Sequence, residues 1–401
     1  RSGAYRGPLH GVPYGAKDLL ATSGGIPTSW GAAPLRNQTF EKDATVIRKL
    51  REAGAVLTAK LAMIEFAGGM GYRQPHATFT GPPRNPWDPE TWTGGSSSGS
   101  GASVSAGLVP FAIGSETWGS ILSPANNCGV AGLRPTYGRV SRAGAMALSY
   151  TLDKLGPLCL TADDCGLVLE AISGGDPADP STSDEHFRYE SIEEGFRLAI
   201  LKDGTDGINE EVGANFQGAL ETLGKFATIE EVEFPDLPYE AITRIILSAE
   251  AASAHEEFIE SGRTSELTAP EDHYGAYPRM VVLAKDYIRA MRLRAKMARA
   301  VDEVMSGFDA VVAPTSRRVA SPIDEEFRRT SPGTSRDIMG AVGNGAGLPS
   351  ISVPSGFTDA GLPTGVQFMG RAYAENTVIA IAKGYQERTD WHVRHPAETT
   401  P

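Results

Sequence analysis

An alternation of helical and strand-like patterns is the feature that most limits what this chain can fold into. Residues 41–53 (EKDATVIRKLREA) place Val46 and Leu50 four positions apart, which is helical spacing. Gly54 predicts the end of that helix, and residues 55–60 (AVLTAK) have the composition of a short buried strand. A helix followed directly by a strand is typical of an α/β sheet.

The rest of the chain continues this pattern. Helices are predicted at residues 102–107, 162–173, 209–224, 279–305 and 375–388. Strands are predicted at residues 108–114, 198–202, 308–314, 350–354 and 365–370. Loops are predicted at residues 74–101, 114–145 and 174–190, and the last of these is the best candidate for an internal boundary.

Charge and composition exclude several classes of function. The formal net charge is −12, and an acidic surface repels phosphate backbones, so no nucleic acid is expected as a partner. Apolar runs are short compared with a membrane span, so no membrane partner is expected either. Cys128, Cys159 and Cys165 form neither a disulfide framework nor a C-x-x-C motif, which favours a reducing, cytoplasmic location.

Searches for metal and cofactor motifs find none. The seven histidines are scattered, and the sequence contains no H-E-x-x-H motif and no P-loop, so no metal and no cofactor are expected. Residues 95–99 (GSSSG) fit the G-x-S-x-G pattern of a nucleophile elbow. The preceding residues (PETWTG) are not strand-like, as that elbow requires, so we interpret the match as accidental.

The most informative stretch runs from Gly94 to Arg142 and contains GGSSSGSGASVSAG and GSETWGS. It closely resembles the signature of the amidase signature family, and RGPLHGVPYGAKDLL upstream and GLPTGVQFMGR downstream extend the resemblance. The resemblance implies an α/β fold with a mixed β-sheet core covered by helices on both faces. It also implies a single domain over residues 1–401, with an N-terminal part missing and a variable insertion at 175–280.

The same resemblance implies a Ser–cis-Ser–Lys triad. Ser120 would be the nucleophile, Ser96 the bridging serine on a cis peptide bond, and Lys17 the base. The roles are chemically consistent, because a buried lysine is driven toward its neutral form and can then accept a proton. A serine hydroxyl both donates and accepts hydrogen bonds, so Ser96 can pass a proton from Ser120 to Lys17.

The loop before the nucleophile departs from the usual T-G-G-S pattern of the family. The backbone N–H groups of Thr117, Trp118 and Gly119 are the expected oxyanion-hole donors, with tryptophan in place of a glycine. Many members have an arginine shortly after the nucleophile, where this chain has Leu122 and Ser123. These differences predict a substrate that is uncharged and apolar near the scissile bond.

Four further residues are predicted to bind substrate by resemblance. Met70, Gly71 and Tyr72 match the substrate-lining loop of the family. Asp337 falls where one of the subunits of the glutamine-dependent tRNA amidotransferases has a glutamine-binding aspartate. The alternative to an uncharged substrate is a charged one, whose carboxylate is bound by another arginine such as Arg73 or Arg279.

The predicted function is hydrolysis of amide-type C–N bonds, in amides or carbamates, through an acyl-enzyme. Short esters can follow the same route. The partner would be a small-molecule substrate, and whether the chain forms a homodimer stays open. Two alternatives remain: the glutamine-binding subunit of a tRNA amidotransferase, or a catalytically silent family member. Residues 256–269 (EEFIESGRTSELTA) lack the Arg-Tyr/Phe-Asp-Gly run of such subunits, whereas Asp337 agrees with them.

Overall fold

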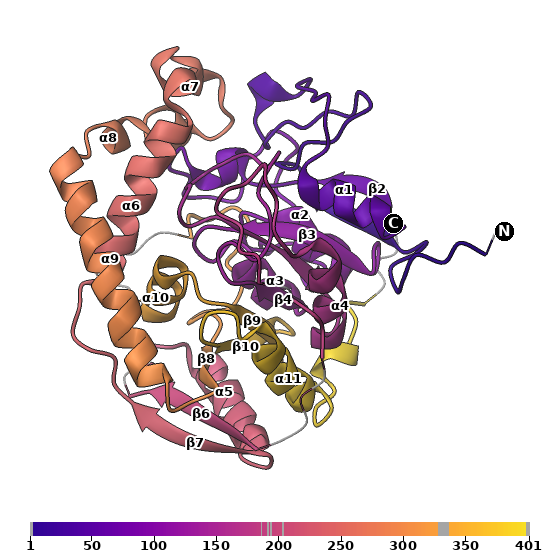
Figure 1. Ribbon diagram of the computed structural model, residues 1–401, viewed down its shortest axis with the longest axis vertical. Helices are drawn as coiled ribbons and strands as arrows, with labels where there is room; N and C mark the ends of the chain where they lie inside the picture. The colour runs from indigo at the N-terminus through magenta and orange to yellow at the C-terminus, as the bar shows by residue number, and fades with distance from the viewer. Residues whose placement is uncertain are drawn as a thin grey trace.

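A mixed β-sheet of ten strands forms the centre of the described part of the molecule (Figure 1). The computed structural model describes residues 3–185, 187–190, 192, 195–202, 204–327 and 337–397. In sheet order the strands are β2 (Val56–Leu61), β1 (Pro13–Lys17), β3 (Phe111–Glu116), β5 (Lys154–Cys159), β4 (Ala131–Arg134), β9 (Ser350–Phe357), β10 (Pro363–Met369), β8 (Ala310–Pro314), β6 (Phe196–Leu201) and β7 (Ala227–Val232). The strands pair in parallel at the two ends of the sheet and antiparallel in the middle.

Helices cover both faces of this sheet, which confirms the predicted fold class. The α-helices are α1 (Thr45–Glu52), α2 (Ser98–Ser105), α3 (Leu122–Cys128), α4 (Ala162–Ile172), α5 (Glu210–Leu223), α6 (Tyr239–Ala254), α7 (Glu256–Glu260), α8 (Tyr277–Met280), α9 (Ala284–Met305), α10 (Ile338–Ala346) and α11 (Glu375–Gln386). Alternate side chains of a strand point to opposite faces. On β8, Val312 belongs to the core cluster that includes residues of α5 and α11, whereas Val311 belongs to the cluster that includes residues of α6, α9 and α10. The long helices α6 and α9 lie side by side along one flank (Figure 1).

The ends of β1 and β3 bring distant parts of the sequence together. These strands are parallel neighbours, with Ala16 opposite Ile113, so their carboxyl ends lie at the same edge of the sheet. Lys17 is the last residue of β1, and Glu116 is the last residue of β3. The loop that follows β3 therefore begins close to the lysine, and α2 packs against both strands.

Several predicted elements are confirmed and others are wrong. Residues 41–60 form α1 and β2 as expected. The stretch predicted as a loop at residues 114–145 contains α3 and β4. The helix α3 (LSPANNC) has weak helix formers, and buried contacts of Ala125 and Cys128 stabilise it instead. The helix predicted at 279–305 begins only at Ala284, after the separate short helix α8.

The structure also addresses membrane insertion directly. No helix among the described residues is both long enough and apolar enough to cross a bilayer.

Candidate active site

Lys17 is completely buried, and three serine hydroxyls surround its amine. Its Nζ donates to Oγ of Ser96 at 2.8 Å, to Oγ of Ser97 at 2.9 Å and to Oγ of Ser115 at 2.9 Å. Burial lowers the pKa of Lys17 from 10.5 to about 7, although the charge of Asp153 acts in the opposite direction. Near neutral pH, a large fraction of the molecules therefore carries an uncharged amine that can accept a proton.

The peptide bond between Gly95 and Ser96 is cis, as the resemblance predicted. The Ser96 side chain is fully buried. A side chain at position 95 would not fit, because a Cβ there would lie 2.7 Å from the ring of Trp92. The contact between the buried Ser96 hydroxyl and Lys17 is the first one that a proton relay requires.

Ser120 lies in the loop that joins β3 to α3. It is 7% exposed, and its carbonyl oxygen accepts a hydrogen bond from the N–H of Ser97 at 3.3 Å. This bond holds the predicted nucleophile loop (residues 117–121) against the segment that carries the cis peptide. The structure therefore brings Lys17, Ser96 and Ser120 into one buried region from positions far apart in the sequence.

A buried carboxylate fixes the end of the nucleophile loop. Glu116 accepts hydrogen bonds from the N–H groups of Ile121 at 2.9 Å and Leu122 at 3.0 Å, and it forms a 2.8 Å ion pair with Arg134. Burial alone would raise the pKa of Glu116, but Arg134 and Lys154 hold it below its usual value. The carboxylate is therefore charged, and it caps the first turn of α3.

The start of the same loop is held by a second carboxylate. Thr117 donates from Oγ1 to Asp153 at 2.5 Å, and Asp153 also accepts from the N–H groups of Leu148 and Ser149. Between these anchors, Gly119 has a φ of 79°, a left-handed conformation that favours glycine. With both ends fixed, the N–H groups of residues 117–119 are held in place, which an oxyanion hole requires.

Trp118 and Asp337, both predicted as site residues, are in direct contact. The indole Nε1–H of Trp118 donates to Oδ2 of Asp337 at 2.7 Å. The other carboxylate oxygen accepts from the N–H of Gly340 at 2.9 Å, so Asp337 also caps α10. The guanidinium of Arg244, on α6, lies 5.1 Å from the centre of the Trp118 ring. This contact joins the nucleophile loop to the helices α6 and α10.

The predicted substrate-lining residues 70–72 are packed tightly. Met70 is fully buried in the main core cluster, and Tyr72 packs against the rings of Trp92 and Phe327. Gly71 has a φ of 121°, and a Cβ there would lie 3.0 Å from Gly275. Contact between these three residues and a substrate stays a prediction.

Comparison with known proteins identifies the family. The Amidase family matches residues 1–379. The chain belongs to the amidase family. This amidase-family chain is 37% identical to a glutamyl-tRNA(Gln) amidotransferase subunit of Lysinibacillus sphaericus, over 98% of this chain and 85% of the relative.

Solved structures of relatives share the fold of this amidase-family chain. The glutamyl-tRNA(Gln) amidotransferase subunit of Thermotoga maritima has a TM-score of 0.81 and 35% identity, with 94% of this chain and 84% of that chain covered. The peptide amidase of Stenotrophomonas maltophilia has a TM-score of 0.85 and 31% identity, with 100% and 87% covered. The chain is thus similar to enzymes that are named for two different reactions.

Sequence reasoning missed several residues that surround the candidate site. Ser97 and Ser115 bind the lysine amine, and Asp153 anchors the nucleophile loop. A cavity of about 370 Å³ is lined by Ser115, Thr117 and Asp153 together with apolar side chains of residues 145–148. The sequence feature that could have indicated Ser115 is its position on β3, the strand that leads to Ser120.

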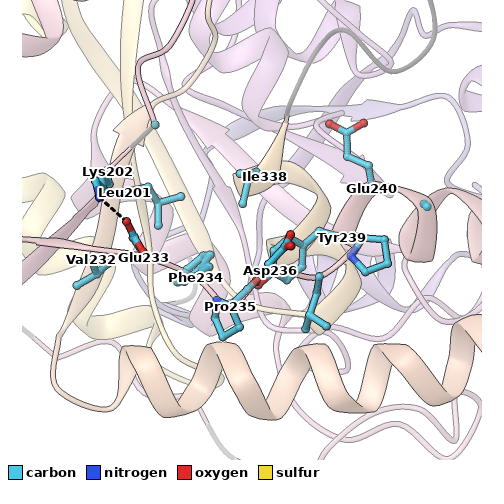
Figure 2. Close-up of a pocket in the computed structure, with 14 residues that line it drawn as sticks. Leu201, Lys202, Val232, Glu233, Phe234, Pro235, Asp236, Tyr239, Glu240 and Ile338 are labelled. Atoms are coloured by element: carbon cyan, nitrogen blue, oxygen red, sulfur yellow. Dashed lines mark hydrogen bonds and ion pairs between the residues drawn. The ribbon is translucent and has the colours of Figure 1, made fainter.

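A second cavity of about 470 Å³ lies where residues 232–241 connect β7 to α6 (Figure 2). It is mainly apolar, with the ion pair of Lys202 and Glu233 at one side. Of its lining residues within the described part of the amidase, none is a predicted catalytic residue. We therefore place the candidate active site at Lys17 and not in this larger cavity.

Proposed function

We propose that this chain hydrolyses amide-type C–N bonds with Ser120 as the nucleophile. Neutral Lys17 accepts the proton of the Ser96 hydroxyl while Ser96 accepts the proton of Ser120. The Ser120 oxygen then attacks the carbonyl carbon, and the N–H groups of residues 117–119 donate to the developing oxyanion. The leaving amine takes the proton back from the relay as the C–N bond breaks, which leaves an acyl group on Ser120.

Water completes the cycle by the same relay. It gives a proton through Ser96 to Lys17, attacks the acyl carbon, and releases the acid and the free Ser120 hydroxyl. The observation that carries this proposal is the buried amine of Lys17 at 2.8 Å from Ser96, with its pKa lowered by burial to about 7. A base with a pKa near the working pH is suited to proton transfer.

A second candidate is the role of a tRNA amidotransferase subunit. The similarity of the chain to a glutamyl-tRNA(Gln) amidotransferase subunit favours this role, since the two are 37% identical over nearly the whole chain. In that role the ammonia released from glutamine would pass to a further reaction, and the chain would work with other subunits. The hydrogen bond from Trp118 to Asp337 favours the free-standing hydrolase, because one oxygen of the aspartate expected to bind glutamine already accepts from the indole.

A hydrolysis screen of the purified chain tests both candidates. We expect turnover of a neutral anilide or carbamate by the isolated chain, and little or no release of ammonia from glutamine. Ser120→Ala should abolish turnover while the protein stays folded, and a fluorophosphonate should label Ser120. Labelling of Ser97 instead would contradict the assignment of the nucleophile. Efficient glutaminase activity would favour the amidotransferase role.

A further inference from the structure

Two carboxyl groups are buried together outside the candidate active site. Glu65 and Asp272 are both 0% exposed. The two oxygens of Glu65 accept hydrogen bonds from the N–H groups of Thr268 and Ala269, each at 3.0 Å. Neither oxygen of Asp272 accepts from an N–H or hydroxyl group among the described residues, and its hydrogen-bond partner is Glu65. Two carboxyl groups can share a hydrogen bond only if one of them keeps its proton.

The shared proton resides on Asp272. Two N–H donors already stabilise the negative charge of Glu65, and Asp272 has no such donors among the described residues. Burial and the contact with Glu65 raise the pKa of Asp272 from 3.8 to about 9, and Glu271 acts in the same direction, whereas the guanidinium of Arg279 opposes it. His255, which also interacts with Arg279, is neutral because burial lowers its pKa to about 4. These neighbours therefore leave Asp272 protonated at neutral pH.

Residues 264–280, called the strap below, lie over the loop of residues 65–74. Besides the carboxyl pair, a second carboxylate attaches the strap to this loop. Glu271 accepts hydrogen bonds from the N–H of Arg73 and from the side-chain amide of Gln74, each at 2.9 Å. The strap is therefore bonded to the loop near both ends of the loop.

Gly275 of the strap packs directly against the predicted substrate-lining residues. A Cβ on Gly275 would overlap the carbonyl oxygen of Met70, and a Cβ on Gly71 would lie 3.0 Å from Gly275. No side chain separates the two backbones here. Movement of the strap would therefore uncover the loop at residues 70–72.

The backbone of the loop under the strap is strained. Phe66 and Ala67 have φ values of 49° and 53°, a left-handed conformation that residues with a Cβ rarely adopt, and Gly68 follows with a φ of 90°. Such a conformation persists only where the surroundings enforce it. Glu65 directly precedes this turn, so its bonds to the strap help to hold the turn in place. Separation of the strap from the loop would let the turn relax.

We propose that Glu65 and Asp272 form a proton-dependent latch, which holds the strap on the loop at low pH and releases it as the pH rises. In the closed state, Asp272 donates its proton to a hydrogen bond with Glu65. In the open state, water surrounds both groups, so Asp272 ionises and releases one proton to the solvent. The equilibrium constant for opening therefore increases about tenfold for each pH unit between about 4 and about 9. The latch makes access to residues 70–72 depend on pH, and it does not depend on the proposed chemistry at Ser120.

Hydrogen–deuterium exchange of the full chain from pH 5 to pH 8, followed by peptide mass spectrometry, measures this opening. When closing is faster than exchange, the protection factor is the reciprocal of the opening constant. For wild-type peptides from the strap and from residues 65–74, we expect protection to fall about tenfold per pH unit after correction for the intrinsic exchange rate. Peptides from β9 should stay more protected at every pH, because they exchange only when the whole molecule unfolds.

Asp272→Asn removes the ionisable group and keeps its shape, and the new amide can donate to Glu65. We expect protection of the strap to become independent of pH, and to exceed that of the wild type at pH 8 by at least about a hundredfold. Glu271→Gln is the matched control. It also removes a carboxylate from the strap, but the proton between Asp272 and Glu65 remains, so the fall in protection per pH unit should persist.

Each outcome decides the proposal. A wild-type strap whose protection does not change with pH overturns it, and this result needs no variant. A pH dependence that persists in Asp272→Asn, or that disappears in Glu271→Gln, overturns the assignment to the carboxyl pair. Equal protection of the strap and of β9 would show that the strap opens only with the whole molecule, which also refutes the latch. None of these measurements uses turnover, so failure of the proposed function would leave the latch untouched.

Discussion

Replacing Glu116 by glutamine tests whether its charge holds the nucleophile loop. The Glu116–Arg134 pair has both side chains at 0% exposure, with a separation of 2.8 Å. A glutamine has one acceptor oxygen, so it cannot serve both Arg134 and the N–H groups of Ile121 and Leu122. Its amide NH₂ would face either the guanidinium or a backbone N–H, and the arginine would remain buried without a counter-charge.

The size of the effect follows from this burial. Breaking a buried ion pair by removing one partner costs about 3–5 kcal/mol, and Glu116→Gln should lower the free energy of unfolding by that order. The assay is urea unfolding followed by tryptophan fluorescence, with the midpoint and the slope fitted together. We expect kcat for a neutral anilide to fall as well, because the N–H groups of the loop lose their anchor.

The double variant Glu116→Gln/Arg134→Met provides the matched control. It removes the uncompensated charge, so it should be more stable than Glu116→Gln alone, although the carbonyl of Leu348 loses its Arg134 donor. Wild-type stability of Glu116→Gln would refute the reasoning. Equally, the charges would not be coupled if the double variant lost as much unfolding free energy as Glu116→Gln and Arg134→Met lose together when each is measured alone.

Three further predictions concern pH and the loop at Gly71. First, kcat/KM should rise with pH through a midpoint near 7 in a pH–rate profile, because only neutral Lys17 accepts a proton. Ser97→Ala removes an acceptor that stabilises the Lys17 ammonium, so it should move that midpoint to lower pH. Second, burial and the neighbouring Glu65 raise the pKa of Asp272 from 3.8 to about 9, so its contribution to stability is full below pH 3.8 and is lost as the pH rises through 9. The unfolding free energy of Asp272→Asn relative to the wild type should therefore increase from pH 5 to pH 8, and the same difference at both pH values in urea unfolding would contradict this. Third, Gly71→Ala should cost about 1–3 kcal/mol of unfolding free energy from its left-handed φ, and unfolding curves identical to the wild type would exclude that strain.

Elements with a strong local pattern could be predicted from the sequence, whereas those made by tertiary contacts could not. Residues 41–60 have clear periodicity and form α1 and β2. The short strands β1 and β4 contain glycine and little apolar pattern, and pairing with their neighbours in the sheet defines them. The helix α3 depends on the cap from Glu116, five positions before Ile121, which no local propensity reveals.

The residues of the candidate site also fall into those that the sequence predicted and those that only the fold brings together. Resemblance predicted the cis bond at Ser96 and the contact of Ser96 with Lys17, and the structure has both. The additional partners of the lysine, Ser97 and Ser115, are ordinary serines in a serine-rich stretch, and only the fold selects them. Trp118 and Asp337 are each predicted as site residues, but their contact spans 219 positions and cannot be read from either local sequence.

The residues of the predicted triad and the residues that hold the Trp118 side chain come from separate parts of the chain. Lys17, Ser96 and Ser120 all lie before β4, whereas the partners of Trp118 are Arg244 on α6 and Asp337, which caps α10, in the second half of the chain. Trp118 is the meeting point of the two parts. A substitution in α6 or α10 can therefore shift the loop that carries Ser120 while Lys17, Ser96 and Ser120 themselves stay unchanged.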